Sequence, residues 1–308
     1  MKKVQTVIPF AKVNDSKLKI NFLEAKKDPV FKKIVESSKI PENILMKHTS
    51  QIEEVSQEYS NCSTCKNLLE CKNKQKGLFL MINSNLKDIS FGYKACKYFE
   101  KFNKDNEYKK YVYLYEIPKD ISSAAIKDIY RNDSSRLPVI KVMKKFIDNY
   151  FQDNHLKGIY LSGNFGTGKT YILSALFNEL AKKKVKSAII YFPEFLRNLK
   201  SSFTTDYEEQ MLAIKRVSLL LIDDIGAENL TSWSRDEVLG PILQYRMQEK
   251  LPTFFTSNLN LSQLEEHLSM TGATVDKVKA RRIIERIKYL ANDIEMVGQN
   301  RRETKNEN

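Results

Sequence analysis

The sequence predicts an α/β protein in which a parallel five-stranded sheet, covered on both faces by helices, is preceded by a small mixed α/β domain. β-like runs alternate with helical stretches in the C-terminal half, which is typical of a parallel sheet with helical crossovers. One stretch, Val217–Ile222, is apolar with almost no alternation, as a central strand buried on both faces requires. The five runs are Gly158–Ser162, Ser187–Phe192, Ser218–Asp223, Thr253–Ser257 and Ile294–Val297.

The boundary between the two parts is predicted from a polar stretch, Asp120–Pro138, which is rich in serine, asparagine and aspartate and ends in proline. The region before it is lysine-rich and predicts amphipathic helices at Phe22–Glu36 and Pro41–Ser60, followed by strand-like runs at Gly77–Ile82 and Tyr111–Ile117. We therefore expect an N-terminal domain over residues 1–118, a linker over 119–137, a C-terminal domain over 138–302 and a disordered tail over 303–308.

The composition excludes several classes of protein. With 308 residues, 42% hydrophobic and 29% charged, and only 10 Gly and 8 Pro, the chain can bury a sizeable core and is neither collagen-like nor wholly disordered. Apolar segments are too short to cross a membrane, and Lys12, Asp15 and Lys17 interrupt the start where a signal peptide is apolar. We therefore expect a cytoplasmic protein without a membrane partner. The net charge of +13 favours polyanionic partners without naming one, since a lysine-rich proteome gives the same bias.

A glycine-rich motif, G-x-x-x-x-G-K-T, lies directly after the first strand of the predicted sheet and before a predicted helix at Tyr171–Lys183. Its glycines let backbone N–H groups curl around phosphate oxygens, and the helix N-terminus favours negative charge. Lys169 is expected to reach the β- and γ-phosphates of a nucleotide, and the hydroxyl of Thr170 to bind Mg²⁺. The motif consists of Gly163, Asn164, Phe165, Gly166, Thr167, Gly168, Lys169 and Thr170.

Polar side chains also follow two other predicted strands at the same edge of the sheet. Asp223 is expected to hold Mg²⁺ and Asp224 to orient the attacking water, although such a pair can also simply cap a loop. Asn258, after the strand Thr253–Ser257, is expected to contact the γ-phosphate or the water; its alternative role is to open a turn.

Together these segments resemble the AAA+ ATPases over residues 139–302, with Gly163–Thr170 as Walker A, Leu219–Asp224 as Walker B and Asn258 as sensor 1. The Asp223-Asp224 pair that ends the Walker B segment resembles the same segment in the AAA+ branch that contains replication initiators and helicase loaders. Within it, Asp223–Glu228, Trp233, Arg235 and Ile242–Arg246 resemble loaders of the DnaC/DnaI type. Because Asp224 is a methylene shorter than glutamate, we expect slow, regulatory hydrolysis of ATP.

The resemblance extends to an arginine-bearing segment, Ala280–Ile287. It implies that an arginine of one subunit completes the ATP site of its neighbour, and Arg286 is the first candidate, with Arg282 the second. A solvated basic face, or local pairing with Glu285, is the alternative.

For function, the resemblance implies an ATPase that loads the replicative hexameric helicase onto single-stranded DNA during primosome assembly and replication initiation or restart. Its expected partners are that helicase, single-stranded DNA, other primosome proteins and further copies of itself through the AAA+ domain. Two alternatives stay open. One is a transposition-helper ATPase of the IstB type, which shares the AAA+ motifs. The other is an ATP-gated adaptor with little turnover.

All four cysteines, Cys62, Cys65, Cys71 and Cys96, lie in one short stretch of the N-terminal domain. A cytosolic chain is not expected to hold disulfides, and a C-x-x-C pair with two more cysteines nearby can surround Zn²⁺ tetrahedrally. The alternative is four reduced thiols in a small core. The resemblance also implies a zinc-bearing N-terminal domain; a histidine can replace one cysteine there, but only His48 is close, so four cysteines are the cleaner set.

A further pattern concerns nucleic acid. Phe195, Arg197, Lys200 and Phe203 recur near helical spacing, and aromatic residues interleaved with cations can hold single-stranded DNA. The alternative is the buried face of an amphipathic helix, which we favour for Phe195 and Phe203. Arg197 and Lys200 are expected on the solvent side.

Overall fold

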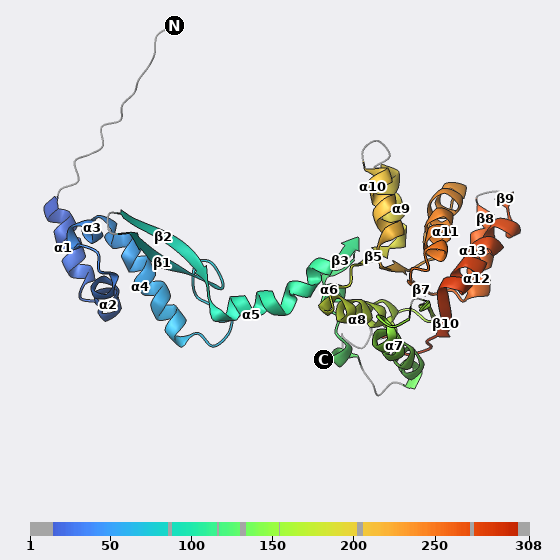
Figure 1. Cartoon of the computed structure of the whole chain (residues 1–308), viewed down its shortest axis with the longest axis horizontal. Coiled ribbons are helices and arrows are strands. Elements are labelled where there is room, and N and C mark those ends of the chain that lie inside the picture. The colour runs from blue at the N-terminus through green and yellow to red at the C-terminus, as the bar shows by residue number, and fades with distance from the viewer. Residues whose placement is uncertain are drawn as a thin grey trace, which may run out of the picture. The chain divides into compact units, whose positions relative to one another are not determined.

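The computed structural model describes residues 15–85, 88–115, 117–129, 134–153, 155–201, 206–271 and 274–300, and the predicted tail over 303–308 lies outside these ranges, as does Phe203. The chain divides into two compact units, Met1–Asn106 and Glu107–Asn308. Figure 1 shows the elements of each unit along the chain. No helix among the residues described here is long and apolar enough to span a bilayer.

The first unit combines helices with an antiparallel hairpin around a small core of apolar residues that includes Phe22, Phe31 and Ile52. The helix predicted over 22–36 is wrong as a single element, because Asp28 caps a new helix by accepting a hydrogen bond from the Val30 N–H at 2.9 Å. The helix predicted over 41–60 is likewise interrupted by a 3₁₀ turn, Met46–His48. The elements are α1 (Asp15–Ala25), α2 (Pro29–Ser38), α3 (Glu42–Leu45), α4 (Thr49–Thr64), β1 (Leu78–Asn85), β2 (Asp88–Ala95) and α5 (Lys97–Asn106).

The second unit is built on a parallel sheet that has six strands rather than the predicted five. The additional strand, β3 (Val112–Tyr115), pairs with β5 (Ser187–Tyr191) in a register that places Val112 opposite Ser187. The predicted end of the first domain at residue 118 is therefore too late, since β3 is part of this sheet. In spatial order the strands are β10 (Ala291–Glu295), β4 (Gly158–Ser162), β7 (Thr253–Ser257), β6 (Leu219–Asp223), β5 (Ser187–Tyr191) and β3.

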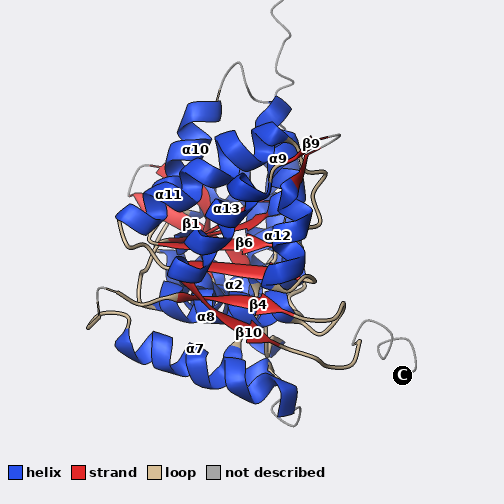
Figure 2. Ribbon diagram, turned by 90° about the vertical axis from the view of Figure 1, so that its right-hand side faces the viewer, coloured by secondary structure: helices blue, strands red, loops and turns tan. Residues whose placement is uncertain are grey.

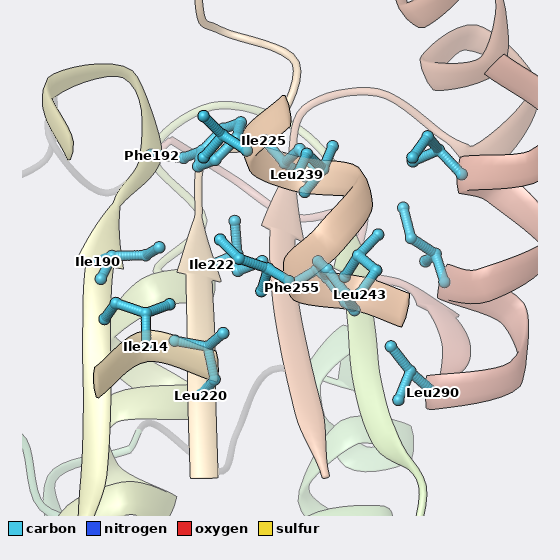
Figure 3. Close-up of a cluster of buried hydrophobic side chains, with 14 of the residues drawn as sticks. Ile190, Phe192, Ile214, Leu220, Ile222, Ile225, Leu239, Leu243, Phe255 and Leu290 are labelled. Atoms are coloured by element: carbon cyan, nitrogen blue, oxygen red, sulfur yellow. The ribbon is translucent and has the colours of Figure 1, made fainter. Parts of the chain in front are cut away.

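Helices cover both faces of this sheet, as predicted (Figure 2). Alternate residues of each strand face opposite sides: Leu220 packs in the cluster of Figure 3, and Leu221 packs in the cluster on the other face. Every residue of β6 is buried, as a central strand requires. The helices are α7 (Leu137–Asn149) and α8 (Lys169–Lys182) on one face, and α9 (Phe192–Ser201), α10 (Tyr207–Arg216), α11 (Gly240–Gln248), α12 (Leu261–Ser269) and α13 (Lys277–Leu290) on the other.

Part of the predicted linker packs against the sheet unit. Helix α6 (Lys119–Ser122) and the turn after it lie along α8, where the Asn178 side chain donates a hydrogen bond to the Ala124 carbonyl at 2.8 Å. Ala124 and Ile129 are buried in the α8-side cluster. The unit also contains a π-helical segment, Trp233–Leu239, and a hairpin of β8 (Met270–Thr271) with β9 (Thr274–Val275).

Candidate nucleotide site

The loop between β4 and α8 has the backbone that a phosphate-binding loop needs. Gly163, Gly166 and Gly168 adopt φ values of 143°, 71° and 90°, which side-chain-bearing residues rarely adopt. Two of the glycines are also in tight contact: a Cβ on Gly163 would lie 2.0 Å from the Met296 carbonyl oxygen, and one on Gly166 would lie 1.7 Å from Oδ1 of Asn300. The segment after β10 thus closes one side of the loop.

Lys169, the first residue of α8, lies in the hollow of this loop. Its side chain is largely buried, and Nζ donates hydrogen bonds to the carbonyls of Gly163 at 2.7 Å and Asn164 at 2.8 Å. A third bond, 2.8 Å long, reaches Oδ1 of Asn258 at the end of β7. The cation therefore joins the loop to the strand end where the sequence predicted a phosphate-sensing amide.

Asp223 ends β6 and is buried beside the loop. Its Oδ1 accepts hydrogen bonds from the hydroxyls of Thr170 at 2.7 Å and Thr256 at 2.6 Å. Burial raises the pKa of Asp223, and the two hydroxyl bonds oppose that rise. A buried carboxylate next to a threonine hydroxyl is a donor set that suits a divalent cation with oxygen ligands.

Asp224 follows in a left-handed backbone conformation, φ 58°, which aspartate tolerates better than most residues. Its N–H donates to the Thr256 hydroxyl at 2.9 Å, and its Oδ1 accepts a bond from the Asn258 side-chain amide at 3.0 Å. Asn258 thereby bridges Lys169 and Asp224. Residues that the sequence predicted from separate segments are thus brought together in one hydrogen-bonded group.

These side chains line a cavity of about 620 Å³. Of the predicted residues, Phe165, Gly166, Gly168, Lys169, Thr170, Asp223, Asp224 and Asn258 form its walls. Sequence reasoning missed five others, because none of them belongs to a motif: Pro118, Ile121, Tyr171, Tyr191 and Thr256. Pro118 lies between β3 and α6, and Ile121 lies in α6, within the stretch interpreted as a linker.

Arg136 is another residue that the sequence analysis missed. It is 3% exposed, and its Nη2 donates a hydrogen bond of 2.6 Å to the Thr167 carbonyl. The guanidinium therefore braces the phosphate loop from the turn before α7. A single arginine in a polar stretch gives no pattern that distinguishes it from a solvated one.

The two candidate arginines of α13 do not line this cavity. Arg286 is half-buried, and its Nη1 donates a hydrogen bond to the Gly240 carbonyl at 3.1 Å. Burial lowers the pKa of Arg286, and the neighbouring Arg282 adds to the effect. Arg282 itself is exposed. Within one chain, neither arginine is part of the nucleotide site.

In the first unit, all four cysteines line a single cavity of about 410 Å³. Three of the thiols have polar contacts: the Gly77 N–H donates to Cys71 Sγ at 3.3 Å, the Asn73 amide donates to Cys62 Sγ at 3.4 Å, and Cys65 Sγ donates to the Asn67 carbonyl at 3.1 Å. Burial raises the pKa of Cys62, and the other three cysteines raise it further. No three His, Cys, Asp or Glu side chains within the described ranges are arranged to hold a metal ion, so the thiols share a cavity without forming a closed ligand set.

The pattern of aromatic and basic residues predicted near α9 lies as expected at the three positions that the structure describes. Phe195 is 2% exposed in the core beneath α9, which confirms its structural interpretation. Arg197 and Lys200 lie on the exposed side of the helix, where Arg197 pairs with Glu194.

The fold and the site define a P-loop nucleotide-binding protein. A family model described as "IstB-like ATP binding protein" matches residues 124–308. The replicative helicase loader DnaI of Bacillus subtilis is 37% identical over 265 residues, which is 85% of each chain. The replicative helicase loader DnaC of Escherichia coli K12 is 27% identical over 128 residues, covering 41% of this chain and 51% of that relative.

Solved structures agree. A crystal structure of DnaI is 47% identical and superimposes with a TM-score of 0.57, covering 63% of this chain and 99% of the other. A putative primosome component from Streptococcus pyogenes is 36% identical with a TM-score of 0.55, covering 64% and 99%. The chain therefore belongs to the IstB-like ATP-binding proteins and, within them, to the family of DnaI-type replicative helicase loaders.

Proposed function

We propose that this protein is an ATP-dependent loader that places the replicative hexameric DNA helicase onto single-stranded DNA during primosome assembly and replication initiation or restart. The observation that carries the proposal is the extent of the match to the B. subtilis loader. At 265 residues it is longer than the whole second unit, so it includes part of the cysteine-bearing unit. The IstB-like model starts only at residue 124, and a transposition helper leaves that first unit without a role.

ATP fits the cavity through the charges around the phosphate loop. Lys169 supplies a cation against the β- and γ-phosphates, and the loop N–H groups and the start of α8 supply partial positive charge. Thr170 and Asp223 would hold Mg²⁺, which when bound neutralises phosphate charge. Asp223 would then stay ionised at a lower cost despite its burial.

Hydrolysis rests on Asp224 and Asn258. Asp224 faces the cavity at the end of β6 and orients the attacking water, while Asn258 contacts the γ-phosphate side of the site. We expect Asp224→Asn to bind ATP with normal affinity and to lose most of its turnover, and Asp153→Asn, on the surface, serves as the matched control. Normal turnover in Asp224→Asn would remove Asp224 from the mechanism.

Self-association completes the site, with Arg286 of one subunit acting on the nucleotide of its neighbour. The supporting observation is that Arg286 is outside the cavity of its own chain, so it has no role in that cavity without a second copy. An arginine at the γ-phosphate is worth on the order of 10³-fold in rate. Arg286→Ala should bind ATP normally and lose hydrolysis or cooperative assembly.

A mixing experiment separates this role from a structural one. Lys169→Ala subunits cannot use their own site but can donate Arg286 to Arg286→Ala subunits, so activity should reappear in the mixture. Arg281→Ala is the control, because Arg281 is exposed on the same helix near Glu265. If the mixture shows only the summed activity of the two inactive variants, the trans role of Arg286 is refuted. If activity reappears only when Lys169→Ala is mixed with Arg282→Ala, the trans arginine is Arg282.

The first unit is proposed to bind Zn²⁺ through Cys62, Cys65, Cys71 and Cys96 and to dock on the helicase. Its support is the chemistry of the donor set, four thiols lining one cavity. None of these four cysteines is in a disulfide, which suits a reducing cytoplasm, where we place the protein. Zinc analysis of the purified full chain tests the assignment.

Single-stranded DNA is proposed to contact Arg197 and Lys200 on the exposed side of α9. The loader assignment as a whole is tested by co-purification with a hexameric replicative helicase, with and without ATP, and by helicase loading on a primed single strand in the presence of other primosome proteins. A stable complex that depends on the nucleotide supports it. No complex in either condition, together with tight binding of duplex DNA, would overturn it in favour of a transposition helper, and loading without turnover would favour the ATP-gated adaptor.

A further inference from the structure

A second cavity lies at the opposite end of the sheet from the nucleotide site. It has a volume of about 360 Å³ and is bordered by β3, by the start of β5 and by the C-terminal end of α10. Lys186 and Ser218 in its lining precede β5 and β6, whereas Tyr191 and Asp223, at the other ends of these strands, line the nucleotide cavity. Neither the motifs nor the loader assignment gives this cavity a role.

Two tyrosines of β3 form one wall. Because side chains alternate along a strand, Tyr113 and Tyr115 share the face toward α9 and α10, while Val112 packs on the opposite side with the α8 cluster. Tyr115 is fixed by an edge-to-face contact with Phe195, at 6.2 Å between ring centroids. Tyr113 is 49% exposed beside it. The edge of the sheet thus presents an aromatic ring held on a rigid strand.

Two cations complete the lining. Lys186 and Arg216 are both exposed, and the cavity contains no acidic side chain among its lining residues. Neither cation forms a salt bridge with any part of the chain that the structure describes, in contrast to Arg197, which pairs with Glu194. The positive charge at this site is therefore available to an anionic ligand.

We propose that this cavity is a contact site for single-stranded nucleic acid, in which a base stacks on Tyr113 and the neighbouring phosphates pair with Lys186 and Arg216. The proposal rests on the proposed function and adds a site to it. Aromatic rings combined with cations bind single strands without regard to sequence, since every base has a flat face. An acidic peptide would satisfy the two cations but would give the exposed ring of Tyr113 no flat partner.

The site also has a physical connection to α9. The ring that Tyr115 contacts belongs to Phe195, and the same helix carries Arg197 and Lys200 on its exposed side. Arg197 and Lys200 themselves line a different cavity, together with residues that follow β6, so the two pairs of cations are separate contacts on the second unit. A single strand bound there contacts the protein away from the nucleotide cavity and leaves the cavity accessible to ATP.

Titration of fluorescent oligothymidylate with the full chain, at several salt concentrations and with saturating ATP, tests the proposal. Tyr113→Leu should weaken binding by about fivefold or more, because stacking on an aromatic ring contributes that much per base. Lys186→Gln combined with Arg216→Gln should reduce the slope of log affinity against log salt by about 1.4, the value for two phosphate contacts on a single strand. The matched control is Lys141→Gln with Lys144→Gln, which removes the same charge from exposed positions of α7 on the other face.

The possible results distinguish a failure of the proposed nucleic-acid site from a failure of the proposed function. If the unsubstituted chain binds the oligonucleotide and all variants match the control pair, the site is overturned while DNA binding stands. If the unsubstituted chain binds no single strand, both the site and the DNA partner are overturned. If the variants keep their oligonucleotide affinity but lose the helicase, the cavity is a protein contact and the proposal fails. ATP affinity unchanged in Tyr113→Leu shows that the unit is intact.

Discussion

The nucleotide site and the cysteine cavity were both predicted from sequence spacing, yet only one of them is assembled by contacts between its own side chains. At the nucleotide site, side chains from three distant segments, at the ends of β4, β6 and β7, are joined by hydrogen bonds of 3.0 Å or less. The cysteines come from one stretch and line one cavity, but within the described residues they do not form a group that could hold a metal ion. Strand ends are placed by the apolar sheet, whereas the burial and the neighbouring thiols that raise the pKa of Cys62 oppose its ionisation unless a cation is bound.

The largest effect is expected at the nucleotide site. Lys169→Ala removes the cation that bonds the loop carbonyls and Asn258, and it should lower nucleotide affinity by at least about a hundredfold. Titration with a fluorescent ATP analogue measures the loss. Lys182→Ala, at the exposed end of the same helix, should bind normally. Equal affinities in the two variants would show that the loop does not hold phosphate.

The zinc assignment of the cysteine cavity is tested by Cys62→Ser combined with Cys65→Ser. If the thiols bind zinc, this variant should lose the metal, and the thermal transition of the first unit should fall by about 10 °C or more, because metal binding and folding are coupled in so small a unit. Mass-spectrometric metal analysis and calorimetry of the full chain measure both. Ser63→Ala is the control between the two cysteines. A metal-free chain with an unchanged transition would identify the cavity as an ordinary core of reduced thiols.

A smaller effect is expected at Arg136, which supports the nucleotide site but does not itself line the cavity. Arg136→Gln removes the charged donor to the Thr167 carbonyl, so nucleotide affinity should fall about tenfold, the size of one charged hydrogen bond. The control is Lys145→Gln, an exposed change on α7. A normal affinity in Arg136→Gln, at unchanged melting temperature, would mean that the loop holds its shape without this brace.

The smallest effect concerns the charge on Asp223. Its raised pKa means that ionisation costs the folded chain stability as the pH rises through that pKa, and that this cost is absent at acidic pH, where the carboxyl is protonated in both states. Without nucleotide and with a chelator, Asp223→Asn should therefore melt about 2–4 °C higher than the unsubstituted chain at neutral pH, with no gain at acidic pH. Added Mg²⁺ and ATP should reverse the order. A variant that is less stable at neutral pH contradicts the electrostatic argument.

How much the sequence could predict depended on whether the signal was local. The phosphate loop was predictable because motif, strand and helix are adjacent, and the carboxylates because β6 is apolar up to Asp223. Strand β3 was assigned to the wrong domain because its four residues pair with β5, far along the chain, and no local pattern specifies that partner. Arg136 was missed for the same reason. The break at Pro29 was different, since Asp28 and Pro29 are a helix-start signal that the amphipathic pattern obscured.

Strand β3 has a practical consequence for work on the ATP-binding unit alone. A fragment that begins at residue 119 lacks β3 and leaves the outer edge of β5 with unpaired N–H and C=O groups, a template for strand addition between molecules. Such a fragment would aggregate through its sheet, and the aggregates would be mistaken for the assembly through which Arg286 is proposed to act. A fragment that begins at Glu107 keeps that edge covered.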